Sequence, residues 1–196
     1  DPEIVFPPLK THYNPRNGLL RLPNEYARDA VEWVTVSNAI SDLRPPVGTE
    51  IRDVDPPYNL HFGRTPTVTS MKRYMAIPEQ GMNRFDLQRV ARHLTPPCWI
   101  KKTSGGTDLF GRLWWNRPAF TVRTEFFKPE KGRYLHPEQH RPITHREAAR
   151  FQSFPDDFIF KGTKIEIAKH IGNAVPPLLA ARIADAVYAL LIRRRK

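Results

Sequence analysis

The sequence predicts an α+β fold, with a small mixed region followed by helices that must dock on a further surface. Three observations support this prediction. Thr144 and Glu147 stand at the spacing of a capping box, in which each side chain bonds the other residue's amide, so a helix should begin there. Pro176-Pro177 suits the first turn of another helix, where proline's missing N–H would be unpaired anyway. Residues 119–124 roughly alternate apolar and polar side chains, as a short strand does.

The first part of the chain has less regular patterns. Residues 1–25 are rich in Pro, Asn and Arg without a clear period, which predicts an extended arm. A short helical pattern covers residues 27–43 and ends at Pro45-Pro46. Residues 46–118 are interrupted by prolines and dense in basic and aromatic side chains, and we expect one helix there, over residues 85–92.

The terminal helix is predicted over residues 176–193, because apolar side chains recur there at three- and four-residue steps. These side chains are Leu179, Ile183, Ala186, Val187, Leu190 and Leu191. A helix with one continuous apolar face needs a partner surface. We therefore expect an exposed apolar stripe wherever that surface is absent.

Composition excludes several classes of protein. At 196 residues the chain can bury a core without covalent staples. Its single cysteine, Cys98, excludes an internal disulfide framework and a multi-cysteine zinc site, and it fits a reducing cytoplasm. No stretch approaches ~18 uninterrupted apolar residues, so we expect no membrane span. The chain begins with Asp1-Pro2-Glu3, without an initiator methionine or a signal peptide, so we expect a segment of a longer protein.

The charge balance points to a polyanionic partner. The chain carries 31 Lys and Arg against 20 Asp and Glu, a formal net charge of +11. Such a surplus attracts nucleic acid. The same surplus is also typical of a solvated basic surface, or of a membrane-binding basic helix at residues 193–196. Charge alone does not decide between these interpretations.

Several linked motifs resemble those of DNA cytosine-5 methyltransferases. Residues Arg141–Phe158 resemble the family's motif IX, and Ile171–Pro177 resemble its motif X. Leu113–Val122 and Tyr134–Pro137 resemble the segment that joins the target recognition domain to motif IX, and Val34–Leu43 resembles the stretch after motif VIII. The motifs occur in the family's order and spacing, so the resemblance spans nearly the whole chain.

The resemblance implies transfer of a methyl group from S-adenosylmethionine to carbon 5 of a flipped cytosine, through attack by a cysteine thiolate. The reacting groups belong to motifs I, IV, VI and VIII, which this sequence lacks. Asp108–Gly111 resembles the start of motif I, but Arg112 follows where glycines are needed. Pro96–Cys98 resembles the nucleophile motif, but Trp99 replaces the expected glutamine. The family's glutamate that protonates cytosine N3 stands in a Glu-Asn-Val triplet, and this sequence contains no such triplet. We therefore expect no catalytic residue in this chain and no activity from it alone.

The resemblance also divides the chain. Residues 1–45 correspond to an arm and helix after the catalytic core, 46–140 to the target recognition domain, and 141–196 to a part that packs back on a Rossmann-like catalytic domain missing here. Motif X implies that Asn173 and Ala174 contact S-adenosylmethionine, and no metal is implied. An asparagine can bond both a carboxylate and a backbone amide. The alternative is a helix-start asparagine that satisfies local backbone groups.

Motif IX implies a scaffolding role for Arg146, Glu147 and Arg150, which would organise the recognition domain against the catalytic one. DNA reading falls to basic and polar residues of the middle region, which suit phosphate and base-edge contacts. The candidates are Lys72, Arg73, Lys101, Lys102, Thr103, Ser104, Arg112 and Arg117. Among these we favour Arg112 and the loop at residues 101–106, where glycines allow close approach to DNA.

Other functions fit less well. Asp156 and Glu166 suggest a nuclease site, but Ala168 stands where its lysine should be. His136 and His140 suggest half of a zinc site without a second pair of ligands. The serious alternative is a noncatalytic DNA-binding module.

The expected partners are double-stranded DNA and a catalytic domain or subunit that carries motifs I to VIII. The expected location is the bacterial cytoplasm, at the nucleoid. The sequence leaves the origin open between an engineered segment, a proteolytic remnant and the smaller subunit of a split enzyme. It also leaves the recognised base sequence open.

Overall fold

The computed structural model describes residues 8–15, 26–101 and 103–193. The chain forms two compact units. The central unit is Thr35–Ala174, and the terminal unit combines Asp1–Val34 with Val175–Lys196. These units cut across the boundaries expected at 45/46 and 140/141, because side chains before and after those positions share one core with residues between them.

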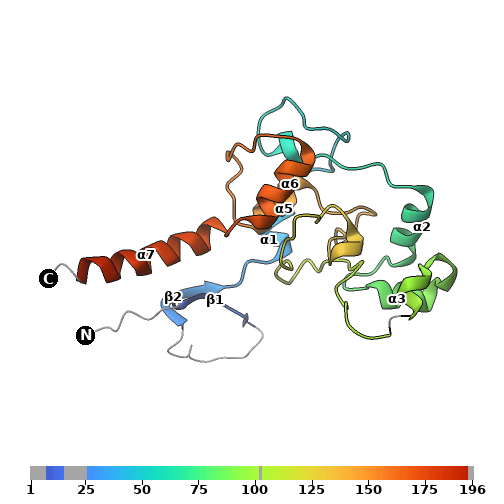
Figure 1. The fold of residues 1–196 in the computed structure, drawn as a ribbon, viewed down its shortest axis with the longest axis horizontal. Helices are drawn as coiled ribbons and strands as arrows, with labels where there is room; N and C mark the ends of the chain where they lie inside the picture. Colours follow the sequence, from blue (N-terminus) through green and yellow to red (C-terminus); the bar gives the residue numbers. More distant parts are fainter. Residues whose placement is uncertain (1–7, 16–25, 102, 194–196) are drawn as a thin grey trace. The chain divides into compact units, whose positions relative to one another are not determined.

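Three helices form the larger core of the central unit: α1 (Val36–Ile40), α5 (His145–Phe151) and α6 (Lys164–Asn173) (Figure 1). The predicted capping box is confirmed. Thr144 Oγ1 accepts a hydrogen bond from the Glu147 amide at 3.2 Å, and Glu147 Oε2 accepts one from the Thr144 amide at 2.8 Å. The buried helical side chains of this core are Val36, Ile40, Ala148, Ala149, Ile167, Ala168 and Ile171.

A second, smaller core lies among α2 (Val68–Ala76), α3 (Arg84–Val90) and α4 (Pro97–Lys101). The helix predicted over 85–92 is confirmed as α3. The buried side chains of this core are Tyr74, Ile77, Leu87, Ala91, Phe110 and Leu135. The short 3-10 turns of the unit are η2 (Tyr58–Leu60), η3 (Arg92–Leu94) and η4 (Pro129–Lys131).

The strand predicted over 119–124 is wrong, since this segment is irregular. Its apolar residues do turn inward, with Val122 buried in the larger core. Its backbone pairs with a side chain instead of a second strand: the Tyr134 hydroxyl donates to the Thr121 carbonyl at 2.9 Å and accepts from the Arg123 amide at 3.1 Å. The alternation of apolar and polar side chains predicted that Val122 is buried, but no second strand pairs with this segment among the described residues.

In the smaller core, the Arg112 guanidinium donates hydrogen bonds to backbone carbonyl groups, as the amides of a neighbouring strand would in a sheet. Its side chain is fully buried. The donors Nε, Nη1 and Nη2 reach the carbonyls of Ile77 at 2.9 Å, His136 at 2.6 Å, Gln139 at 2.8 Å and Tyr74 at 3.0 Å. Burial lowers the pKa of Arg112 to about 10, so the group stays charged at neutral pH. This guanidinium therefore connects residue 112 to Ile77 and Tyr74, which lie 35 and 38 positions away in the sequence.

In the terminal unit, strands β1 (Lys10–Tyr13) and β2 (Tyr26–Glu32) form a two-stranded parallel sheet, with Lys10 opposite Tyr26 (Figure 1). The arm predicted at 1–25 is therefore wrong for the residues of β1. The rest of that arm, at 1–7 and 16–25, lies outside the described residues.

The helix predicted over 27–43 is wrong for the part that forms β2 and right only for α1. A strand is decided by pairing with a segment elsewhere, and a short apolar run has too few residues to separate the two periods. The helical part begins after Thr35, whose hydroxyl accepts a hydrogen bond from the Asn38 amide.

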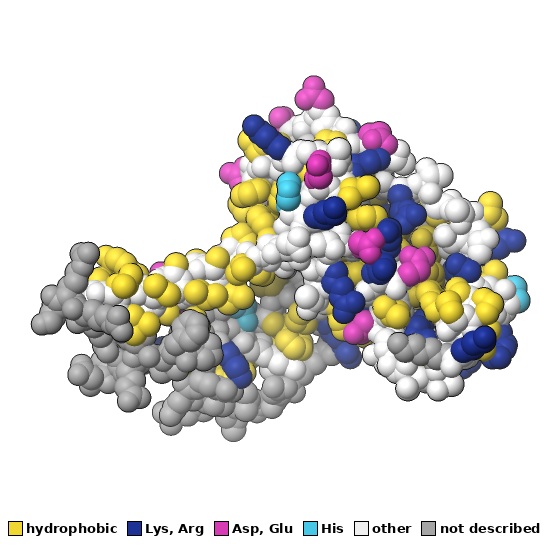
Figure 2. Space-filling model, in the orientation of Figure 1, with side chains coloured by type: hydrophobic (Ala, Val, Ile, Leu, Met, Phe, Trp, Pro, Cys, Tyr) yellow, Lys and Arg dark blue, Asp and Glu magenta, His cyan; other side chains and the backbone are white. Residues whose placement is uncertain are grey.

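The terminal unit also contains α7 (Pro177–Arg193), which confirms the helix predicted over 176–193. Its apolar side chains are exposed, including Leu179 at 50% and Leu191 at 57%, and Figure 2 shows hydrophobic side chains along its length. No single helix among the described residues is long and apolar enough to cross a membrane. Only Lys164–Asn173 and Pro177–Ile192, taken together as a bent pair, reach that length and composition.

We predict that Arg112→Met lowers the free energy of unfolding by at least about 3 kcal/mol, because it leaves the carbonyls of Tyr74, Ile77 and His136 without their donor. Urea unfolding followed by circular dichroism measures this change. Arg117→Met is the matched control: Arg117 is exposed, and its guanidinium lies 4.5 Å from the Trp114 ring, a contact of about 1 kcal/mol or less. Equal losses in the two variants would contradict the structural role.

Candidate functional site

Glu147 lies at the centre of a buried polar network at the start of α5. Arg141 donates to both of its carboxylate oxygens, at 2.8 and 2.7 Å, and the Thr144 amide donates at 2.8 Å. Burial raises the pKa of Glu147, but the charge and hydrogen bonds of Arg141 outweigh burial and lower it to about 2. The network continues to His61, whose Nδ1 lies 2.9 Å from Thr144 Oγ1. Glu147 is thus an ionised group whose contacts hold neighbouring segments together.

Two arginines on the same helix reach other segments. Arg146 donates to the Pro57 carbonyl at 3.1 Å and to Asn59 Oδ1 at 2.9 Å. Arg150 forms ion pairs with both Asp42 and Asp156, with shortest distances of 2.6 Å. The hydrogen bonds that Arg150 donates to Asp156 raise the pKa of Arg150. Arg146 and Arg150 thus contact segments about 87 to 111 positions away in sequence.

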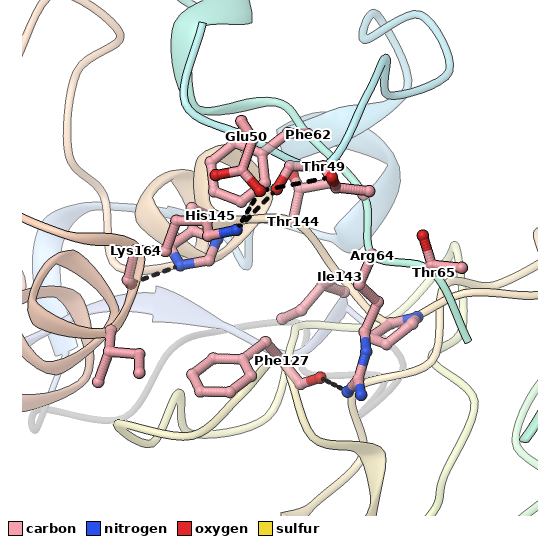
Figure 3. Close-up of a pocket in the computed structure, with 13 residues that line it drawn as sticks. Thr49, Glu50, Phe62, Arg64, Thr65, Phe127, Ile143, Thr144, His145 and Lys164 are labelled. Atoms are coloured by element: carbon pink, nitrogen blue, oxygen red, sulfur yellow. Dashed lines mark hydrogen bonds and ion pairs between the residues drawn. The ribbon is translucent and has the colours of Figure 1, made fainter. Parts of the chain in front are cut away.

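A pocket of about 390 Å³ lies beside this helix (Figure 3). The aromatic rings of Phe62, Phe127 and His145 line it, and Arg64 and Lys164 stand among its polar lining residues. Arg64 Nη1 donates to the Phe127 carbonyl at 2.9 Å, and Lys164 Nζ donates to a Glu50 oxygen at 2.7 Å. Sequence reasoning missed this pocket, because its lining comes from segments up to 116 positions apart and no local pattern joins them.

The segment resembling motif X, Ile171–Pro177, begins in the last turn of α6 and continues beyond its end. Asn173 is the last residue of that helix and its side chain is exposed, so the alternative interpretation as a helix-start residue is wrong. Gln152 Nε2 donates to the Ile171 carbonyl at 2.9 Å and lies 3.5 Å from the Ala174 carbonyl oxygen. A Cβ on Gly172 would stand 2.3 Å from the Thr124 amide nitrogen, so only glycine allows this approach. Gln152 and Gly172 together set the position of Asn173 and Ala174.

The predicted DNA-binding residues divide into exposed and occupied groups. Lys72, Lys101, Thr103, Ser104 and Arg117 are exposed in the central unit. Arg73 is half-buried and its Nε donates to the Leu94 carbonyl at 2.7 Å. Lys102 lies outside the described residues.

The prediction that Arg112 contacts DNA is wrong, because its guanidinium is buried and its donors bind carbonyl groups of the chain. Sequence reasoning did not single out Arg89 and Arg92. These exposed arginines border a shallow hollow of about 330 Å³ together with Thr103. The available signal was their three-residue spacing, which places two cations on neighbouring turns.

His136, one of the two histidines considered for zinc, accepts backbone hydrogen bonds. His136 is buried, and its Nδ1 accepts hydrogen bonds from the amides of Glu138 at 3.2 Å and Gln139 at 3.0 Å. Burial lowers the pKa of His136 to about 4, so the ring is neutral at pH 7. Among the residues that the structure describes, no group of three or more His, Cys, Asp or Glu side chains could hold a metal ion.

Comparisons with known proteins give a consistent family. The sequence matches the family of C-5 cytosine-specific DNA methylases over residues 50–189. Type II methyltransferase M1.HphI of Haemophilus parahaemolyticus is 38% identical over 119 residues, which are 61% of this chain and 28% of that protein. Type II methyltransferase M1.BsuMI of Bacillus subtilis (strain 168) is 34% identical over 150 residues, which are 76% of this chain and 32% of that protein.

A solved structure described as a DNA modification methyltransferase encoded within an E. coli prophage is similar in fold, with a TM-score of 0.54 and 22% identity. The likeness covers 82% of this chain and 48% of that one. The chain therefore spans about a third or less of the length of the two relatives described above and about half of the solved structure.

We predict that the free energy of unfolding falls as the pH falls from about 6.5 to 4. The pKa of His136 and of His145 is lowered by burial from 6.5 to about 4. The unfolded chain therefore takes up protons first in this range, and each ring contributes at most about 3 kcal/mol of lost stability. Urea unfolding at several pH values measures the slope.

His136→Asn should flatten this dependence by at most about 3 kcal/mol over the same range, because the asparagine oxygen can accept the same two amides without titrating, while His61 and His145 still titrate. The control is His93→Asn, since His93 is exposed on η3. Loss of the Trp115 edge contact, at 5.2 Å between ring centroids, lowers stability at every pH and leaves the slope unchanged. A wild-type slope in His136→Asn would show that this ring does not titrate as described.

Proposed function

The chain belongs to the family of C-5 cytosine-specific DNA methylases, and from this membership we propose that it is the part that reads DNA and completes the cofactor site. One observation carries the proposal. The matched region extends over residues 50–189, yet the sequence contains no Glu-Asn-Val triplet and its only cysteine lies in Pro-Pro-Cys-Trp. The reacting groups of the family must then be supplied by another stretch of protein.

We assign DNA reading to residues 46–140. Much of this region consists of loops, and buried arginines donate hydrogen bonds to their carbonyls. Binding residues often lie on loops that a rigid scaffold positions in this way. Lys72, Lys101 and Arg117 are exposed there and can contact phosphates.

We assign the cofactor contact to Asn173 and Ala174. The family uses S-adenosylmethionine, which supplies the methyl group when bound. The local structure fits such a ligand: the Asn173 side chain is exposed and makes no hydrogen bond to the described part of the chain. Its amide can donate to a carboxylate and accept from an amine or amide. Gln152 and Gly172 hold the segment in place, so this chain orients one wall of the cofactor site.

A catalytic domain or subunit with motifs I to VIII would cover the terminal unit. Parallel sheets are normally buried on both faces, and a two-stranded one is marginal by itself. Exposed Leu178, Val187 and Leu190 on α7 likewise require a covering surface. The alternative function is a DNA-binding module without a catalytic partner, which the overall charge would also suit.

We predict that the pure chain transfers no methyl groups and that adding a separately expressed catalytic half, carrying motifs I to VIII, restores transfer. Incorporation of radioactive methyl groups into duplex DNA measures both. Methyl transfer by the intact chain alone would overturn the proposal. DNA binding without restored transfer by a catalytic half that is itself folded would favour the noncatalytic module.

In the restored enzyme, Asn173→Ala should raise the KM for S-adenosylmethionine about tenfold or more, because a polar contact to the cofactor is lost. Asn173→Asp keeps the size but loses the donor and should behave similarly. His170→Ala, at an exposed position on α6, is the control and should keep the wild-type KM. Unchanged KM values in both Asn173 variants would remove this residue from the cofactor site.

A further inference from the structure

The loop between α4 and Phe110 contains Gly105 and Gly106, and one buried arginine donates hydrogen bonds to its backbone carbonyls. The loop residues Thr103–Thr107 are exposed, whereas Arg84 on α3 is only 1% exposed. The Arg84 guanidinium donates to the carbonyls of Gly105 at 2.6 Å and Gly106 at 3.1 Å. It also donates to the carbonyl of Trp99, in α4, at 3.3 Å. Arg84 therefore fixes both the start of the loop and its tip.

The hydrogen bonds of Arg84 determine which way the loop amides point. In a planar trans peptide, the C=O of one residue and the N–H of the next point in opposite directions. The carbonyls of Gly105 and Gly106 point to the guanidinium, so the N–H groups of Gly106 and Thr107 point away from it, toward solvent. Within the described part of the chain these two N–H groups donate no hydrogen bond.

The backbone conformation of the loop requires glycine. Gly105 and Gly106 have φ values of +68° and +60°, a region that other residues rarely adopt. A Cβ on Gly106 would also stand 2.9 Å from the Leu109 side chain. The sequence therefore supports a shape that presents two successive amides over a buried positive charge. Backbone amides in this kind of arrangement bind anions.

A second observation lies next to the loop. A shallow hollow of about 330 Å³ is lined by Thr103 and by residues of α3 and η3: Phe85, Gln88, Arg89 and Arg92. Arg89 is 71% exposed, and one of its nitrogens lies 2.9 Å from Asp86, which neutralises part of its charge. Arg92 is also exposed. Cations and an aromatic ring thus border the same loop that presents the amides.

We propose that this loop and hollow form a site for the phosphodiester backbone of DNA. In this site the amides of Gly106 and Thr107 bind a phosphate, Arg89 and Arg92 bind neighbouring phosphates, and Arg84 is the positioning residue. The site rests on the DNA-reading function proposed above. It adds Arg84, Arg89 and Arg92 to the DNA-binding machinery, in the place that Arg112 was expected to take.

Salt dependence of DNA binding tests the two exposed arginines. The full chain is titrated with fluorescent duplex DNA over a range of KCl concentrations, and the logarithm of affinity is plotted against that of salt. The double variant Arg89→Gln/Arg92→Gln should reduce the slope by about two and weaken binding about tenfold or more at ~0.1 M salt. The control Lys161→Gln/Lys169→Gln changes the net charge equally at exposed positions near and on α6, and should keep the slope.

Amide NMR spectra test the loop directly. Adding duplex DNA should shift the Gly106 and Thr107 amide resonances, whereas a duplex with neutral methylphosphonate linkages should not. In Arg84→Gln the DNA-induced shifts of these two amide resonances should disappear. The effect of Arg89→Gln/Arg92→Gln on the salt slope is a separate result of the binding titration. Arg84→Lys keeps the charge but cannot reach the same carbonyls together, so it should restore the shifts only in part.

The outcomes separate this inference from the function on which it rests. No salt-sensitive binding of duplex DNA by the wild-type chain would overturn the DNA-reading function itself. Normal binding with unshifted loop amides, and with equal slopes for the arginine variant and the lysine control, would overturn the site and leave DNA reading in place.

Discussion

Carbonyl groups in the central unit are satisfied by buried arginines instead of by a sheet, and the rest of that unit depends on this arrangement. Buried backbone groups need hydrogen-bond partners, and the described residues of the smaller core form only isolated β-bridges, through Leu135, instead of a strand ladder. Arg84, Arg112 and Arg133 each donate to carbonyls of two or more separate segments. A guanidinium has five donors in a rigid plane, so one side chain can organise several loops, whereas lysine offers a single flexible centre.

This use of arginine changes the meaning of the net charge. The surplus of +11 counts every lysine and arginine, but some guanidinium groups are buried and occupied within the chain. Their charge still contributes to the field that attracts DNA, while direct contacts must come from exposed groups such as Lys101 and Arg117. Scaffolding and binding therefore draw on the same residue type, and burial separates the two roles.

The two compact units differ in how complete they are. The central unit has two cores, and the capping box of α5 and the Arg141–Glu147 pair find their partners within it. The described part of the terminal unit has a two-stranded parallel sheet and a helix with exposed apolar side chains. Such elements are stabilised when other elements cover them. The proposed division of labour follows from this contrast: one unit holds the DNA-reading loops, and the other joins a larger fold.

Elements with local signals could be predicted from the amino-acid sequence. The capping box at Thr144 and Glu147, the terminal helix after Pro176-Pro177 and the helix α3 follow from caps and apolar spacing, which act within a few residues. The motif order likewise predicted the family that the match over residues 50–189 establishes. The strands β1 and β2, the irregular path of residues 119–124 and the burial of Arg112 could be known from the folded chain alone. These features depend on partners distant in sequence, and whether an arginine faces DNA or carbonyl groups is decided by which segments fold around it.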